Sequence, residues 1–216
     1  MDSPIIISLD GNIGAGKSTL LDAISKKISY ISVVPEPVGD WLNMKNEKGE
    51  SLLSLFYGDM QRWCYTFQNC ALLTRLMETQ RIIREWDGIR PVILTERSIM
   101  TDRYVFADML HRQGKMDDLE WNLYLKWFDH FAKDAPVKGV IHLTTSASTS
   151  KNRIGIRGRK GEEDIPLQYL KDLDEQHAKW IQESHLPTLE ITTDEGHSID
   201  EAVEQIDKWI ASNFIA

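Results

Sequence analysis

The strongest constraint in this sequence is a glycine-rich loop between a strand-like run and a helix-like run. Residues 11–18 read GNIGAGKS and fit the pattern G-x-x-x-x-G-K-[ST] at every fixed position. The apolar, β-branched residues 5–9 predict a buried strand before the loop, and apolar residues at helical spacing over 20–28 predict an amphipathic helix after it. Backbone N–H groups and a helix N-terminus then form a phosphate-binding site. The predicted donor-phosphate residues are Gly11, Asn12, Ile13, Gly14, Ala15, Gly16, Lys17, Ser18 and Thr19. Of these, Lys17 is expected to contact the β- and γ-phosphates and Ser18 to hold Mg²⁺.

Strand-like and helix-like segments alternate along the rest of the chain. Further strands are expected at 31–34, 91–95, 137–143 and 186–191, and further helices at about 59–86, 102–112, 117–133 and 199–213. This alternation favours a five-stranded parallel sheet with helices on both faces and ligands beyond the carboxyl ends of the strands. We therefore expect one α/β domain over residues 1–216.

Composition narrows the partners and the cellular compartment. A formal net charge of −8 argues against an extended nucleic-acid surface. Cys64 and Cys70 lie six residues apart in one predicted helix, where they face different directions, so reduced thiols are expected rather than a disulfide or a metal pair. The chain carries no apolar run of membrane-spanning length and no basic N-terminal leader. We expect a cytoplasmic protein with no membrane partner.

Residues 151–164 read KNRIGIRGRKGEED and interrupt the alternating pattern. On a helix, Arg153 and Arg157 would share one face, and Arg159 follows Gly158, which can act as a hinge. By itself the segment fits a solvated basic turn equally well. Beside a phosphate-binding loop, it is better interpreted as a lid that supplies arginines to the γ-phosphate and excludes water.

Two carboxylates and one helix face are candidates for the acceptor site. Glu36 and Glu96 each follow a predicted strand, so both belong at the carboxyl edge of the sheet, either as functional groups or as turn and cap acids. Arg97 would satisfy a substrate oxygen or pair with the acid beside it. Gln68 and Arg75 share a helix face with Ala71; an amide there suits a nucleobase edge, although such a face can also be partly exposed.

Taken in order, these motifs resemble the deoxynucleoside kinases of the deoxycytidine, deoxyguanosine and insect-type multisubstrate group. The similarity runs nearly end to end. The matching motifs are the P-loop, Glu36-Pro37-Val38 with Trp41, the helix from Trp63 to Arg75, Glu96-Arg97-Ser98, Asp102-Arg103-Tyr104, Arg157-Gly158-Arg159 and Ile165-Pro166-Leu167. The resemblance implies a P-loop kinase fold and phosphate transfer from ATP or another nucleoside triphosphate, with Mg²⁺, to the 5′-hydroxyl of a deoxynucleoside for nucleotide salvage.

The resemblance also implies a role for each matching residue. Glu36 would be the general base, Arg97 would position the 5′-hydroxyl, and Glu96 would hold Mg²⁺ together with Ser18. The remaining implied contacts are Gln68 with the base edge, Trp41 along the nucleoside, Phe106 stacked on the base, Tyr57 and Glu162 with the 3′-hydroxyl, Arg153, Arg157 and Arg159 with the donor phosphates, and Asp194 and Glu195 around the donor base.

Substrate choice is expected to depend on Ala71, Arg75 and Asp102. The deoxycytidine and deoxyguanosine kinases carry arginine and aspartate at the last two positions, whereas thymidine-preferring members carry apolar residues. Such a pair would accept the amino group of cytosine or adenine and crowd a thymine methyl group, or would serve only as a structural salt bridge. We expect deoxycytidine and purine deoxynucleosides to be preferred over thymidine.

Two positions depart from what the implied roles require. Tyr57 precedes Gln68 by eleven residues, about 16 Å along a straight helix, so either the helix begins near Asp59 and Tyr57 folds back, or Tyr57 is a core residue. The lid departs from its relatives at Lys160-Gly161, just before Glu162.

Three other functions remain alternatives at this stage. A thymidylate-type monophosphate kinase would need a cation where Glu36 lies, because a carboxylate repels an acceptor phosphate. A regulatory GTPase would need an Asn-Lys-x-Asp motif, which is absent from the sequence, and an inactive scaffold would not keep every catalytic position filled.

The resemblance also implies an oligomeric state. Family members are homodimers built through helices, and Trp121, Leu125 and Phe128 would either form such an interface or face the core.

Overall fold

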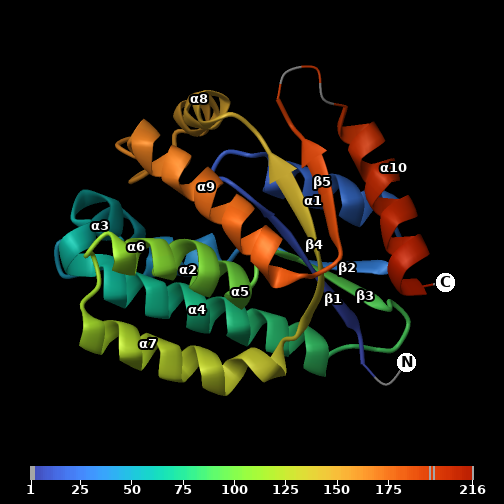
Figure 1. Ribbon diagram of the computed structural model, residues 1–216, viewed down its shortest axis with the longest axis horizontal. Helices are drawn as coiled ribbons and strands as arrows, with labels where there is room; N and C mark the ends of the chain where they lie inside the picture. Colours follow the sequence, from blue (N-terminus) through green and yellow to red (C-terminus); the bar gives the residue numbers. More distant parts are fainter. Residues whose placement is uncertain (1–2, 195, 197, 216) are drawn as a thin grey trace.

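Five parallel strands form the centre of the molecule (Figure 1). The structure is a computed structural model that describes residues 3–194, 196 and 198–215. The strands are β1 (Ile5–Gly11), β2 (Ile31–Val34), β3 (Val92–Glu96), β4 (Val137–Thr144) and β5 (Thr188–Thr192), in the order β2-β3-β1-β4-β5. The predicted five-stranded parallel sheet is therefore confirmed. Because β1 is the central strand, the glycine-rich loop that follows it lies in the middle of the carboxyl edge.

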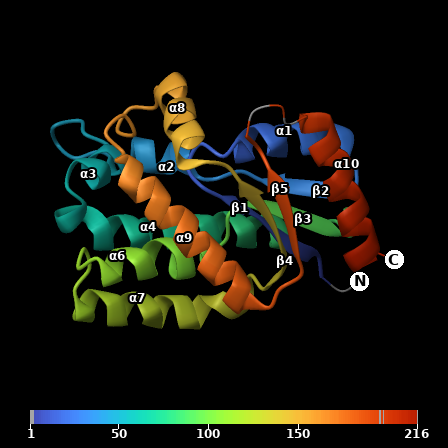
Figure 2. The same cartoon turned by 45° about the horizontal axis from the view of Figure 1, so that its top comes forward.

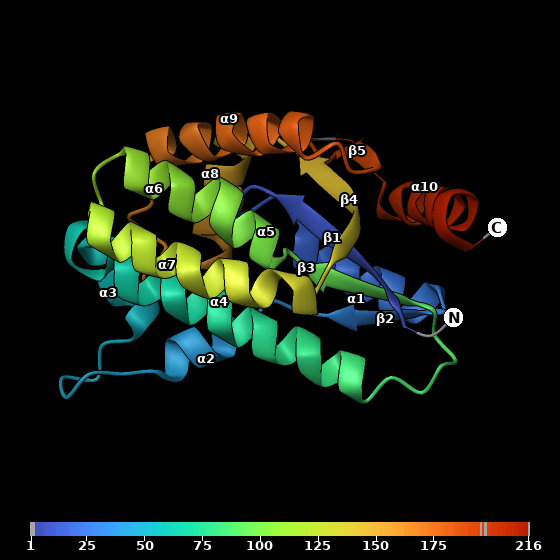
Figure 3. The same ribbon diagram turned by 60° about the horizontal axis from the view of Figure 1, so that its bottom comes forward.

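Helices cover both faces of the sheet, as predicted (Figure 3). The α-helices are α1 (Lys17–Lys27), α2 (Val38–Asn43), α3 (Leu52–Gly58), α4 (Met60–Arg84), α5 (Ile99–Thr101), α6 (Asp108–Arg112), α7 (Asp118–Phe131), α8 (Ala147–Arg157), α9 (Leu167–Ser184) and α10 (Ile199–Ile210). The other helical elements of the described residues are the π-helical segments η1 (Asp102–Ala107) and η3 (Ala211–Ile215) and the 3₁₀ turn η2 (Ala132–Asp134).

Alternation along β1 divides the core into two layers. Ile7 and Leu9 pack with α1 and α10, whereas Ile6 packs with the larger helical layer built from α4, α7 and α9. The buried strands are apolar on both sides because helices cover both sides. Figure 2 shows α8 at the carboxyl end of the sheet, where it follows β4. In the described residues, no helix combines the length and apolarity needed to cross a bilayer.

The segment before α4 differs from the sequence prediction. Residues 38–58 form two short helices, α2 and α3, joined by a loop that is closed by a bridge between Lys45 and Ser51. Ser51 caps α3, and Asp59 caps α4 through a hydrogen bond from the Arg62 N–H. Tyr57 therefore belongs to a separate helix, which removes the distance problem that one straight helix would create.

Candidate active site

A cavity of about 690 Å³ opens at the carboxyl edge of the sheet. It is lined by the loop after β1 and by parts of α2, α3, α4, η1 and α8, together with the turns after β3 and β5. Nearly every predicted site residue lines this cavity. Gly11 and Asn12 are not on its wall, and Glu195 lies outside the described residues.

The glycine-rich loop packs closely against its neighbours. Gly14 has a φ of 82°, and a Cβ atom there would lie 2.6 Å from the Ser150 carbonyl oxygen at the start of α8, so only glycine fits. The buried Asn12 side chain donates to the Leu170 carbonyl (2.8 Å) and to Asp174 (2.6 Å). Asn12 thus anchors the loop to α9 through its side chain.

Lys17 is the first residue of α1 and is buried within the loop. Its Nζ donates to the carbonyls of Gly11 (3.1 Å) and Asn12 (2.8 Å). Burial, aided by the positive charge of Arg97, lowers the pKa of Lys17 to about 7. The ammonium is therefore only partly charged at neutral pH until an anion lies beside it.

Ser18 and Glu96 form an oxygen-rich pair next to Lys17. The Ser18 hydroxyl donates to Glu96 Oε1 at 3.0 Å. A hydroxyl and a carboxylate are hard donors that suit Mg²⁺, which is commonly held by one or two protein oxygens together with substrate phosphates. Among the described residues, no group of three or more His, Cys, Asp or Glu side chains forms a larger metal site. The donors present fit the predicted ion.

Glu36 follows β2 and lies between two guanidinium groups. Its Oε1 accepts from Arg97 Nη1 at 2.6 Å and from Arg75 Nη2 at 3.0 Å. Burial alone would raise the pKa of Glu36, but the charges of Arg97, Arg75 and Lys17 outweigh it and hold that pKa well below its ordinary value. Glu36 is thus an ionised carboxylate on the cavity wall, and Arg97 forms its ion pair with Glu36.

Arg97 has an uncommon backbone conformation for a side chain of its size. Its φ is 59°, and its N–H donates to the Leu9 carbonyl at 2.9 Å. The guanidinium also donates to the Gly11 carbonyl (3.2 Å) and lies 5.0 Å from the centre of the Phe106 ring. Strain of this kind persists where the surrounding structure fixes it, commonly at functional sites.

Arg75 on α4 donates hydrogen bonds to three separate segments of the cavity wall. Its Nε donates to Asp102 at 2.8 Å, Nη1 to the Glu96 carbonyl at 2.6 Å, and Nη2 to Glu36. The expected Arg75–Asp102 pair therefore exists, and Arg75 also contacts Glu36, the candidate general base. Asp102 and Phe106 both come from η1, a π-helical segment of the kind often found at functional sites.

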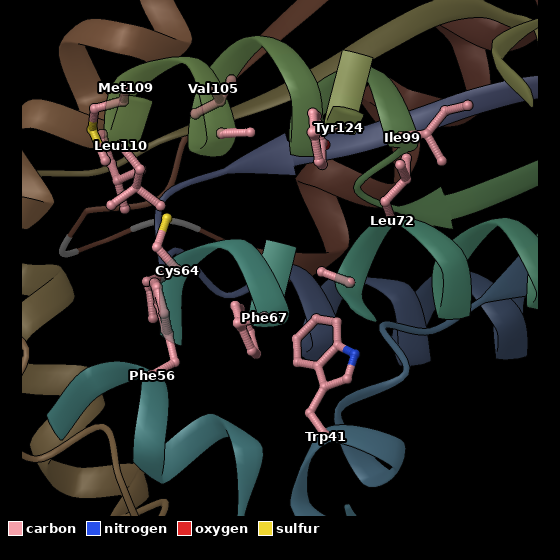
Figure 4. Close-up of a cluster of buried hydrophobic side chains, with 14 of the residues drawn as sticks. Trp41, Phe56, Cys64, Phe67, Leu72, Ile99, Val105, Met109, Leu110 and Tyr124 are labelled. Atoms are coloured by element: carbon pink, nitrogen blue, oxygen red, sulfur yellow. The ribbon is translucent and has the colours of Figure 1, made fainter. Parts of the chain in front are cut away.

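Aromatic rings form the wall beside Gln68. Phe67 stacks on Phe56 with ring centres 4.4 Å apart. Trp41 packs edge-on against Phe67, with ring centres 5.2 Å apart (Figure 4). Gln68 is buried yet lines the cavity, and no hydrogen bond joins its amide to another residue in the part of the chain that the structure describes. An unpaired amide beside flat apolar rings suits a planar ligand with polar edges.

Sequence reasoning missed several wall residues: Leu53, Phe56, Phe67 and Tyr169. Phe67 lies four residues before Ala71 on the same face of α4, so helical spacing could have identified it. Leu53 and Phe56 belong to α3 and Tyr169 to α9, two helices that were not predicted.

The arginine-rich segment begins as helix α8 and ends at Gly158, whose φ is 58°. Arg157 and Arg159 both bind the buried Glu162, the latter at 2.9 Å, and Arg153 donates to the Thr193 carbonyl at 2.6 Å. Burial and the nearby charge of Glu162 raise the pKa of Tyr57. The structure thus brings Tyr57 and Glu162 to the same end of the cavity, although they come from distant parts of the chain.

Asp194 lies in the turn after β5, where its carboxylate accepts from the Thr145 hydroxyl (2.8 Å) and the Ser146 N–H (3.0 Å). These hydrogen bonds lower the pKa of Asp194 and hold the start of α8. Its side chain is therefore engaged with protein, while the turn itself lines the cavity near the P-loop.

Comparison with known proteins agrees with this geometry. A family model described as deoxynucleoside kinase matches residues 7–215. The chain is 31% identical to the deoxycytidine kinase of Homo sapiens, covering 95% of this chain and 91% of that protein. It is 38% identical to a probable deoxycytidine kinase of fowlpox virus (92% and 83% covered) and 30% identical to a mitochondrial deoxyguanosine kinase of Xenopus laevis (81% and 72% covered). The chain belongs to the deoxynucleoside kinase family, and it is an enzyme with the P-loop kinase fold that takes a nucleoside and a nucleotide phosphate donor.

Proposed function

We propose that this enzyme transfers the γ-phosphate of ATP to the 5′-hydroxyl of a deoxynucleoside for nucleotide salvage, with deoxycytidine and purine deoxynucleosides preferred over thymidine. The observation that carries the proposal is the ionised Glu36 on the cavity wall, held by Arg97 and Arg75. A carboxylate in this place can accept a hydrogen bond from a neutral hydroxyl. The names of the relatives support the nucleoside as acceptor.

Each group around the acceptor has a distinct task. Glu36 orients the 5′-hydroxyl and takes its proton, while Arg97 fixes the carboxylate and contacts the same oxygen. Because its pKa is low, Glu36 is a weak base, which suits phosphoryl transfer through a loose transition state.

Lys17 and the arginines Arg153, Arg157 and Arg159 contact the donor phosphates, with the arginine-rich segment 151–164 acting as the lid. When bound through Ser18 and Glu96, Mg²⁺ neutralises charge that develops on the phosphates. Asp194 and Glu195 are the proposed contacts for the donor base.

The same residues disfavour a monophosphate kinase. An acceptor phosphate would have to lie against the Glu36 carboxylate, and two like charges a few ångströms apart in a partly desolvated cavity repel strongly. The neighbouring Arg97 does not remove this conflict, because it is already paired with Glu36.

Base selection is assigned to one end of the aromatic wall. Gln68 would bind the base edge, Phe106 would stack on the base, and Trp41 would pack along the nucleoside. The buried Arg75–Asp102 pair offers a carboxylate to an exocyclic amino group and leaves a charged surface where a thymine methyl would lie. The small side chain of Ala71 leaves room for the base beside the Arg75–Asp102 pair.

The proposal is tested by incubating the protein with ATP, Mg²⁺ and deoxycytidine and identifying the product. Deoxycytidine 5′-monophosphate is expected, with its phosphorus coupled to the 5′ protons in the NMR spectrum. ATP hydrolysis without a phosphorylated nucleoside, or phosphate on the 3′-oxygen, would contradict the assigned geometry.

Donor binding should be linked to proton uptake by Lys17. At pH 8 most Lys17 side chains are neutral, because their pKa is about 7; donor phosphates favour the charged form and so raise that pKa. Titration calorimetry in two buffers of different ionisation enthalpy is expected to show uptake of up to one proton per ATP at pH 8. Lys17→Arg, which is always charged, should show none. Binding by the unmodified protein with no proton exchange would contradict the lowered pKa.

We also propose that the enzyme is a homodimer, built through the outward face of α7. Phe128 is buried and Trp121 stacks between His111 and Tyr124, so the core alternative holds for both, and Leu125 is only half-buried. The outward face of α7 instead carries Leu119, Leu123 and Trp127, which are 80%, 43% and 42% exposed. These residues repeat every four positions, so they form one apolar stripe suited to a second copy.

Trp127→Glu is expected to convert the dimer to a monomer at micromolar concentration, because the charge would be buried in the stripe. Light scattering coupled to size-exclusion chromatography measures the mass. Asn122→Glu adds the same charge beside the stripe and should leave the dimer intact. A monomeric unmodified protein would remove the proposal.

A further inference from the structure

Gly161 lies where the arginine-rich segment touches α3. Its φ is 95°, and a Cβ atom built there would lie 2.7 Å from Ser54 Oγ and 2.8 Å from Ser54 Cα. Both distances are shorter than real Cβ contacts, and one of them is to backbone. The position therefore admits no side chain while the two segments remain in contact.

The α3 side of this contact is held firmly. The Ser51 hydroxyl accepts from the Ser54 N–H and donates to Ser54 Oγ at 2.9 Å. Ser54 thus belongs to the capped first turn of α3, and the same short helix carries Tyr57 one turn later. A shift of Ser54 would move Tyr57 with it.

The other side of the contact is held as well. The Gly161 N–H donates to Glu163 Oε2 at 2.6 Å, and Lys151 Nζ donates to the carbonyls of Glu163 (3.0 Å) and Ile165 (2.6 Å). The next residue, Glu162, is buried and binds Arg157 and Arg159. The place of Gly161 against α3 therefore fixes how far Glu162 reaches into the cavity.

We infer that Gly161 and Ser54 form a positioning contact that sets the spacing between Glu162 and Tyr57, and so determines how strongly the enzyme requires a 3′-hydroxyl on its substrate. The inference rests on the proposed function, in which Glu162 and Tyr57 bind that hydroxyl. Neither Gly161 nor Ser54 touches the substrate. Because both partners are fixed by their own hydrogen bonds, a side chain at the contact must displace one of the two sugar-binding groups.

The test compares deoxycytidine with 2′,3′-dideoxycytidine, which lacks the 3′-hydroxyl. The unmodified enzyme is expected to favour deoxycytidine in kcat/KM by at least about tenfold, because a site built for a hydroxyl is left unpaired by the analogue. Gly161→Ala should reduce this preference about tenfold or more, mainly through kcat/KM for deoxycytidine, since displacements of about 1 Å can cost 10²-fold.

Two further variants separate the contact from other effects. Gly88→Ala places the same side chain at a φ of 79° with no atom within 4 Å, so it reproduces the backbone strain alone and should keep the full preference. Ser54→Leu enlarges the opposite partner at a helical position, without backbone strain, and should reduce the preference as Gly161→Ala does. If Gly161→Ala does not fold, Ser54→Leu decides.

The outcomes distinguish this inference from the proposed function. If the unmodified enzyme prefers deoxycytidine and both contact variants keep that preference, the inference is overturned and the proposed sugar site stands. If the unmodified enzyme phosphorylates both nucleosides equally well, Glu162 and Tyr57 do not bind the 3′-hydroxyl, and the inference fails with that assignment. Loss of the preference in Gly88→Ala as well would also overturn it.

Discussion

Glu36→Gln is expected to lower kcat by about 10²- to 10⁴-fold, the range typical for loss of a general base. The amide has nearly the same shape, so nucleoside binding should change only a few-fold. It cannot accept the proton of the 5′-hydroxyl, and it leaves Arg97 and Arg75 without their shared carboxylate. Steady-state kinetics with deoxycytidine, and separate titration of deoxycytidine binding, measure the two effects.

The pH dependence gives an independent check on Glu36. A lowered pKa means that the carboxylate stays ionised as the pH falls, so the acidic limb of kcat/KM should lie below the ordinary range for glutamate. Removing a guanidinium partner with Arg75→Met should move that limb upward. Glu78→Gln, at an exposed ion pair on α4, serves as the control and should leave kcat unchanged. A nearly active Glu36→Gln enzyme would remove Glu36 from the mechanism.

Arg75→Met combined with Asp102→Ala is expected to raise the thymidine-to-deoxycytidine ratio of kcat/KM by about ten- to hundredfold. The double change replaces a charged surface with space that a thymine methyl group can occupy. Activity with deoxycytidine should fall most, because the proposed contact between its amino group and the Asp102 carboxylate is removed. Kinetics with both nucleosides measure the ratio.

The free energy of unfolding distinguishes a role of the Arg75–Asp102 pair in substrate choice from a purely structural role. Each single change leaves a buried charge with fewer partners and is expected to cost about 3–5 kcal/mol in the free energy of unfolding. The double change should cost less than the sum, because it removes both charges together. Urea denaturation gives these values. A double variant with an unchanged substrate ratio would show that the pair serves only the fold.

Much of this architecture could be predicted because it depends on local sequence patterns. The strand, loop and helix around Lys17 follow from apolar spacing and from a fixed glycine pattern, and the five strands are apolar runs bounded by turn residues. The start of the helix expected at about residue 59 is local too, because Asp59 caps α4 through a neighbouring N–H group. Such features need no knowledge of the rest of the chain.

The partners within the site could not be read from local pattern. Glu36 pairs with Arg97 rather than leaving Arg97 to the adjacent Glu96, because β2, β3 and β1 bring Glu36 and Arg97 together at one edge of the sheet. Arg75 reaches three different segments at once. These contacts depend on strand order and on side-chain rotamers, which spacing alone does not determine.

Other differences have similar causes. The short helices α2 and α3 depend on caps and on the Lys45–Ser51 bridge more than on a long apolar stripe. In α9, the buried residues Tyr169, Leu173 and Trp180 do follow helical spacing, so this helix was within reach of the pattern and was missed. The sequence left open which residues of α7 face the core, because apolar residues surround much of that helix.

The most direct test of the proposed mechanism is to compare deoxycytidine with deoxycytidine 5′-monophosphate as acceptors for the γ-phosphate of ATP in the same assay. Rapid transfer to the nucleoside and little or none to the monophosphate are expected, because the proposed mechanism places the ionised Glu36 carboxylate against the acceptor oxygen. Transfer to the monophosphate with the nucleoside left unchanged would contradict it: the P-loop would still bind the donor, but Glu36 would not be the base.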